Sequence, residues 1–285
     1  MDDFSLVNPP RYIVRQYTDS IFKIVRMNHS VKYVVGGDKP PNNVNDHKLD
    51  NNLSRAKKVV LELALCNPWD WFFTLTIDPN KYDRGSLDVW YKSFTQWLRD
   101  QRKKGVNIKY LVIPEQHENG KWHCHGFLYG DMQLIPFRSV SRPVPRYLID
   151  KGFYDWPAYF SKFGFCSLGR IRSHVKSAFY VTKYLTKNPD RMVTAMGSHL
   201  YYASLGLNRS EKIFDLFDNC PQWDKYLTHS YEFCKVGMPT IKNSWTELFD
   251  DSVDCDNLFS LDLPDQTDFL ADLSAINYEQ TSFSL

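Results

Sequence analysis

The pattern of apolar and polar positions predicts buried strands in the central part of the chain. Residues 71–77 (WFFTLTI) are aromatic or β-branched with no charge among them, which is typical of a buried strand. Residues 108–114 and 121–129 are two further apolar runs. Asn119 and Gly120 lie between these runs and form a strong hairpin signal, because both residues readily adopt the positive φ of a tight turn. We therefore expect the two runs to pair as antiparallel strands.

Apolar residues at helical spacing predict helices around these strands. Ser54 can cap a helix that runs to Leu65, and Ser86 can cap another that runs to about Lys104. A fourth strand is expected over residues 165–172, followed by a helix over about 173–188 that Pro189 ends. This order of elements implies an α+β fold, with a central antiparallel sheet and helices packed on one face.

Composition divides the chain into four expected segments. Residues 1–53 form an N-terminal extension, which ends in a linker rich in Gly, Pro, Asn and Asp. Residues 54–209 hold the predicted sheet and its helices. Residues 210–249 are expected to be a C-terminal helical extension, and residues 250–285 an acidic, disordered tail.

Charge is distributed unevenly along the chain. From Asp250 to the end there are nine acidic residues and no Lys or Arg, although the whole chain has a net charge of only +2. Without those nine, 35 basic residues stand against 24 acidic ones, a net charge of +11 on residues 1–249. A basic body suits a polyanionic partner, while the tail can compete with that partner or simply keep the chain in solution. The aromatic content of 15% suits base stacking as well as an aromatic core.

The remaining composition argues against several classes of protein. The six cysteines are scattered without CxxC spacing, so neither a zinc knuckle nor a disulfide framework is indicated. No stretch approaches about 18 apolar residues, and the N-terminus lacks the pattern of a signal peptide. We expect a cytoplasmic protein without a membrane partner. The motif GxxxxGK[ST] is absent, so a fused helicase is not expected.

An HxH motif in the third predicted strand is the first candidate for chemistry. Side chains two residues apart in a strand share a face, so His123 and His125 project together while Cys124 faces the other way. Two imidazoles on one face can clamp a divalent metal ion, although surface histidine pairs are also common. The third ligand would come from the other strand of the hairpin. Glu115 is one candidate, and His117 is another or could contact a ligand; either set leaves coordination positions open for a phosphate oxygen.

Tyrosines and lysines alternate along the helix predicted after the fourth strand. Tyr180 and Tyr184 are four residues apart and share a face, and Lys183 and Lys187 form an adjacent cationic stripe. The lysines could hold a phosphate and favour the phenolate of a tyrosine that attacks phosphorus. Taken alone, the pattern favours a helix that buries two tyrosines and exposes two lysines.

Three motifs in order carry a resemblance to a known family. Residues 73–76 (FTLT) place Thr74 and Thr76 on one face of a core strand, which by itself establishes nothing. FTLT, then ExxxxxxxHxH, then YxxKYxxK resembles the ordered motifs of the HUH endonuclease superfamily, the rolling-circle replication initiators of phages and plasmids. The stretch IPEQHENGKWHCHG is similar to phage and prophage replication proteins whose third motif has two tyrosines spaced YxxxY. Residues 54–209 would then be the HUH endonuclease domain.

The resemblance implies a role for each matching residue. His123 and His125 would be the two HUH histidines, and Glu115 would be the acidic third ligand of Mg²⁺ or Mn²⁺. Tyr180 would be the first nucleophile and Tyr184 its partner. Some members of the family work with one tyrosine, and the third ligand varies in type and position.

Further side chains are expected to act on DNA. Lys183 matches a lysine that often follows the first tyrosine of the family by three residues. Contacts with single-stranded origin DNA are expected from a set of basic and hydroxyl side chains: Lys187, Thr74, Thr76, Arg170 and Arg172.

The resemblance also implies a reaction and its partners. Attack by Tyr180 would leave a 5′-phosphotyrosine and a free 3′-OH that primes a host DNA polymerase, with a host helicase unwinding the duplex in the bacterial cytoplasm. Two alternatives remain open. One is a non-catalytic RRM-like protein that binds single-stranded nucleic acid on Phe72, Phe73 and Trp122. The other is a relaxase or single-strand transposase with the same chemistry.

Overall fold

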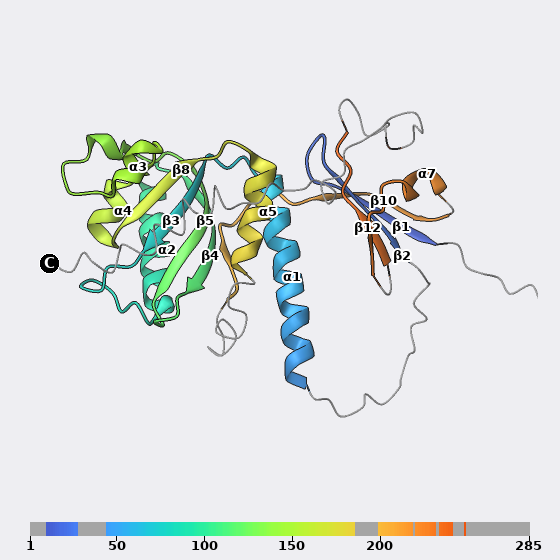
Figure 1. The fold of residues 1–285 in the computed structure, drawn as a ribbon, viewed down its shortest axis with the longest axis horizontal. Helices are drawn as coiled ribbons and strands as arrows, with labels where there is room; N and C mark the ends of the chain where they lie inside the picture. The colour runs from blue at the N-terminus through green and yellow to red at the C-terminus, as the bar shows by residue number, and fades with distance from the viewer. Residues whose placement is uncertain are drawn as a thin grey trace, which may run out of the picture. The chain divides into compact units, whose positions relative to one another are not determined.

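The protein consists of two compact units, formed by residues 43–208 and by residues 1–42 with 209–285 (Figure 1). Each unit is considered by itself. The structure is a computed structural model that describes residues 10–27, 44–185, 199–218, 220–231, 234–241 and 248.

A seven-stranded antiparallel sheet forms the centre of the unit of residues 43–208, with the strand order β6-β7-β8-β3-β5-β4-β9. Its long strands are β3 (Trp71–Thr76), β4 (Ile108–Gln116), β5 (Trp122–Gly130) and β8 (Cys166–Arg170). Three short strands complete it: β6 (Ile135–Pro136), β7 (Tyr154–Asp155) and β9 (Tyr202–Ala203). Each long strand begins and ends within two residues of its predicted bounds, and the hairpin at Asn119 and Gly120 pairs β4 with β5 as expected.

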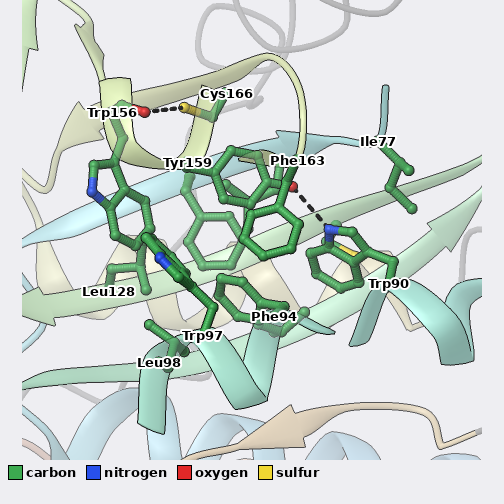
Figure 2. Close-up of a cluster of buried hydrophobic side chains, with 14 of the residues drawn as sticks. Ile77, Trp90, Phe94, Trp97, Leu98, Leu128, Trp156, Tyr159, Phe163 and Cys166 are labelled. Atoms are coloured by element: carbon green, nitrogen blue, oxygen red, sulfur yellow. Dashed lines mark hydrogen bonds between the residues drawn. The ribbon is translucent and has the colours of Figure 1, made fainter. Parts of the chain in front are cut away.

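An aromatic core fills the space between one face of this sheet and helices α2 (Leu87–Lys103) and α4 (Pro157–Lys162) (Figure 2). The rings of Trp90 and Phe94 on α2 are stacked with centroids 5.1 Å apart, and the indole nitrogen of Trp90 donates to the Tyr159 hydroxyl at 3.2 Å. Phe73 and Leu75 reach this core from β3. The segment between β5 and β8 was expected to be irregular, but it also contains η1 (Phe137–Ser139) and α3 (Arg146–Asp150).

Helices α1 (Val44–Cys66) and α5 (His174–Tyr184) lie side by side on the other face of the sheet (Figure 1). The α+β class and the antiparallel sheet are as predicted, and these two helices add a layer to the face that was expected to be open. Helix α1 begins ten residues before Ser54, so the second half of the expected linker is helical. Once a helix is nucleated, each further turn costs little, even in a sequence of modest propensity.

A second antiparallel sheet joins the two ends of the chain, with the order β10-β1-β2-β12-β11. Its elements are β1 (Arg11–Gln16), β2 (Phe22–Met27), β10 (Glu211–Phe217), α7 (Pro221–Asp224), β11 (His229–Ser230) and β12 (Cys234–Gly237). Buried Tyr12, Phe22 and Trp223 are among the residues of its core. The prediction of a helical extension over residues 210–249 is therefore wrong for most of the described residues there. The reason is that β10 pairs with β1, at the other end of the chain, which a local pattern cannot reveal.

Two further expectations concern the ends of the chain and the membrane. The acidic tail, residues 250–285, lies outside the described residues. Within the described ranges, no helix combines the length and the apolar character needed to span a bilayer.

Candidate functional site

The register of three neighbouring strands gathers the predicted metal ligands on one face of the sheet. Strands β4 and β5 place Glu115 directly opposite His123, and β3 and β5 place Thr74 opposite His125. His123 and His125 share this face, as the strand spacing predicts, and Cys124 enters the aromatic core on the opposite face. Burial raises the pKa of the Cys124 thiol far above its usual range, so this cysteine stays a neutral core side chain.

His125 is hydrogen-bonded through both ring nitrogens. Its Nε2 lies 2.8 Å from Oε2 of Glu115, and its Nδ1 lies 3.2 Å from the Thr74 hydroxyl. All three side chains are buried. A carboxylate and a hydroxyl therefore hold the imidazole in one orientation, which is how proteins align histidines that bind a metal ion or act on a substrate.

His123 has a different environment from His125. Its Nε2 lies 3.0 Å from Nη2 of Arg84, and its ring lies 4.2 Å from the ring of His117. Its Nδ1 is buried with no hydrogen-bond partner among the described residues. Burial lowers the pKa of His123 well below its usual value, and the neighbouring imidazoles and Arg84 lower it further. The ring is therefore neutral at physiological pH, the form that can coordinate a metal ion.

Helix α5 places the two predicted nucleophiles beside these histidines. The Tyr184 ring is stacked on the His125 imidazole with centroids 4.1 Å apart, and the Tyr180 and Tyr184 hydroxyls are 2.7 Å apart. Phe72 on β3 packs against both tyrosine rings, with centroids 5.5 and 6.4 Å away. The sequence favours this helix, since Ser173 caps its first turn by accepting from the Lys176 amide at 3.4 Å.

The two phenols differ in how easily they can ionise. Burial raises the pKa of Tyr180 to about 12 and that of Tyr184 well above its usual value. The hydrogen bond between them lowers the pKa of Tyr180 and raises that of Tyr184. Tyr184 therefore acts as the donor, and Tyr180 is the phenol whose anion is better stabilised.

The donor set fits a divalent metal ion in chemistry and in register. One carboxylate and two neutral imidazoles on adjacent strands form a facial set that leaves positions open, and the buried Nδ1 of His123 marks a polar group without a protein partner. In the described part of the chain, however, no three His, Cys, Asp or Glu side chains are already arranged around a common metal position. Glu115 bonds His125 directly, so these side chains would rearrange on metal binding.

The residues predicted to contact DNA do not form one surface. Thr74 and Thr76 are buried, and Thr74 orients His125, so their placement does not support direct contact with DNA. Arg170 lies over the ring of Trp71, 4.8 Å from its centroid, on the face of the sheet opposite the histidines. The expected role of Arg170 at this site is therefore wrong, because its register position turns it away. Arg172 is exposed after β8.

The two predicted lysines and the alternative aromatic platform have separate locations. Lys183 is exposed on the outer side of α5, and Lys187 lies outside the described residues. The platform expected for an RRM-like protein is covered: α5 packs on Phe72, while Phe73 and Trp122 belong to the aromatic core. These rings are not available for base stacking in this arrangement.

Comparison with known proteins agrees with the position of the site. Residues 70–189 match the family model of the replication-associated protein ORF2, and this range includes every residue of the cluster from Thr74 to Tyr184. No curated protein and no solved structure matches the chain. The chain is thus similar to replication-associated proteins of this family over its central sheet and α5, which supports membership of a replication-initiator family.

Proposed function

We propose that the protein is a metal-dependent endonuclease that nicks single-stranded DNA at a replication origin through a tyrosine. One observation carries this proposal. A continuous row of contacts runs from Glu115 to His125 at 2.8 Å, from His125 to Tyr184 at 4.1 Å between ring centroids, and from Tyr184 to Tyr180 at 2.7 Å. A candidate metal ligand and a candidate nucleophile are thus joined through two side chains. The match over residues 70–189 supports the same role.

The residues of the row would divide the reaction between them. Tyr180 attacks phosphorus through its phenolic oxygen, the bond from phosphorus to O3′ breaks, and O3′ takes up a proton as the phenol loses one. The hydrogen bond from Tyr184 stabilises the Tyr180 phenolate. A Mg²⁺ or Mn²⁺ ion held by Glu115, His123 and His125 would supply Lewis-acid stabilisation of charge on the scissile phosphate.

Access to the nucleophile requires a movement of α5. Tyr180 and Tyr184 are 2% and 6% exposed, so a phosphate cannot reach either hydroxyl while their helix lies against the sheet. A shift of α5 away from Phe72 would uncover both phenols together. The products would be a 5′-phosphotyrosine and a 3′-OH that a host polymerase extends, with a host helicase opening the duplex.

The test is covalent capture of DNA. A fluorescent single-stranded library of random sequence is incubated with the protein, with Mn²⁺ or with a chelator, and analysed on denaturing protein gels. We expect a labelled adduct that needs Mn²⁺, disappears in the Tyr180→Phe/Tyr184→Phe double variant and is lost in His123→Ala. Lys176→Gln, an exposed change on the same helix, is the matched control. Binding of the library without any adduct in the wild type would reject the endonuclease.

A relaxase or a single-strand transposase would give the same adduct. Sequencing the captured DNA, and testing whether the released 3′-OH is extended by a polymerase, separates these activities from origin nicking.

A further inference from the structure

Arg84 lies beside the site, although nothing in the local sequence singles it out. It belongs to the segment between β3 and α2, and its Nη2 lies 3.0 Å from Nε2 of His123. A guanidinium can only donate hydrogen bonds. Nε2 of His123 is therefore the accepting, unprotonated nitrogen of that ring.

The backbone around Arg84 is tied to the start of β5. The Trp122 amide donates to the Arg84 carbonyl at 3.0 Å, and the Trp122 indole donates to the Gly85 carbonyl at 3.2 Å. The Asp83 carboxylate accepts from the Gly85 amide at 2.8 Å and tightens the same turn. Because Trp122 directly precedes His123, these bonds hold the base of the Arg84 side chain next to the site.

The charge of Arg84 lacks a compensating anion. Its guanidinium is partly buried, and its Nε is a buried donor without a hydrogen-bond partner. Among the described residues, no carboxylate forms an ion pair with it, whereas Arg142 makes two hydrogen bonds to Asp155 at 2.8 and 3.0 Å. Burial lowers the pKa of Arg84, with Asp78 opposing this effect. A partly buried cation without an anion is unfavourable, which points to an anionic ligand.

We propose that Arg84 binds the DNA phosphate attacked in this site, an inference that rests on the proposed function. A guanidinium matches the geometry of two phosphate oxygens and can donate to both. The unprotonated nitrogen of His123 has one lone pair, so it cannot accept from Arg84 and bind a metal ion at the same time. Arg84 therefore leaves His123 when the metal ion binds, and its freed N–H groups turn to the phosphate.

This exchange gives one substitution two effects of opposite sign. Arg84→Gln removes a positive charge and a competing donor from the metal position, so Mn²⁺ binds the free protein more tightly. The same change removes a phosphate contact, so single-stranded DNA binds about tenfold more weakly, and the slope of log affinity against log salt falls by about 0.7. A merely structural role for Arg84 would weaken both kinds of binding.

The experiment compares wild type with Arg84→Gln and Arg84→Lys, and uses Arg99→Gln as the matched control. Arg99 is an exposed arginine of α2, a helix on the opposite face of the sheet. Mn²⁺ alone is titrated by calorimetry, and a fluorescent oligothymidylate is titrated without metal over a series of salt concentrations. Thermal unfolding shows that each variant is folded. We expect the control to match wild type, Arg84→Gln to show the two opposite shifts, and Arg84→Lys to keep most of the salt slope. Unchanged DNA affinity and slope in Arg84→Gln, or weaker Mn²⁺ binding, would overturn the proposal.

Failure of this inference can be told from failure of the proposed function, because neither titration needs cleavage. Opposite shifts with no covalent adduct in the wild type would leave Arg84 as a phosphate-binding residue and reject the endonuclease. An adduct formed by Arg84→Gln at the wild-type rate would keep the endonuclease and reject the role of Arg84. If both hold, we expect adduct formation in Arg84→Gln to slow about 100-fold.

Discussion

The ring of Tyr184 lies almost parallel to the imidazole of His125, with planes 13° apart and centroids 4.1 Å apart. This stacking joins the helix that carries the phenols to the strand that carries the histidines. Glu115 and Thr74 hold His125 from its two nitrogens, so the position of Tyr184 is set by a side chain that is itself fixed in place. The nucleophile pair and the metal ligands thus form one packed cluster.

The two tyrosines are expected to act in a defined order. Because Tyr184 donates to the Tyr180 oxygen, Tyr180→Phe should abolish the first adduct, whereas Tyr184→Phe should only slow it by about tenfold, the kinetic equivalent of one lost hydrogen bond. Single-turnover adduct formation on captured DNA measures both rates. A Tyr180→Phe protein that still reacts at the wild-type rate would show that Tyr184 attacks first.

The third metal ligand can be assigned by two substitutions. Glu115 bonds His125 directly, while His117 packs its ring against His123. We expect Glu115→Gln to weaken Mn²⁺ binding by more than about 100-fold and His117→Gln by less than about tenfold, the range typical of groups that support a ligand. Calorimetry with Mn²⁺ alone measures both affinities. The reverse ranking would make His117 the ligand.

Gly126 follows the second histidine in a conformation that only glycine tolerates. Its φ is +148°, and a Cβ there would lie 1.9 Å from the Leu111 carbonyl oxygen on β4. Gly126→Ala should therefore lower the free energy of unfolding by more than about 3 kcal/mol, because strain and a backbone clash add together. Gly120→Ala is the control, since Gly120 also has a positive φ but has open space around it, and it should cost only about 1–2 kcal/mol. Urea unfolding measures both, and equal losses would contradict the clash.

Stability should fall on acidification, in part through His174 at the start of α5. Burial lowers the pKa of His174, and hydrogen bonds to backbone groups of Ala64 and Asn67 oppose this effect. Below about pH 6.5 the unfolded chain binds a proton that the folded protein resists, so the contribution is complete above that pH and is lost as pH falls through it.

Replacing His174 should therefore reduce the acid sensitivity of the protein. We expect the drop in melting temperature between about pH 7.5 and pH 5.5 to be smaller in His174→Gln than in wild type. His199→Gln, which changes an exposed histidine of the same unit, should leave the drop unchanged. An identical drop in all three proteins would show that His174 does not contribute.

The strands and the shared face of His123 and His125 could be predicted from the sequence because both are local properties. A strand places side chains on alternating faces, and Asn119 with Gly120 sets the hairpin that brings Glu115 opposite His123. The same alternation sends Cys124 into the core. No partner beyond the hairpin was needed for these conclusions.

The tertiary structure decided which surfaces meet. Only the packing of α5 on the sheet shows that Tyr184 stacks on His125, because helical spacing defines a face but not what that face contacts. Arg84 reaches His123 through a loop clamped by Trp122, and β1 pairs with β10 across most of the chain. Such contacts depend on how distant elements dock to bury apolar surface, which periodicity within a short window does not contain.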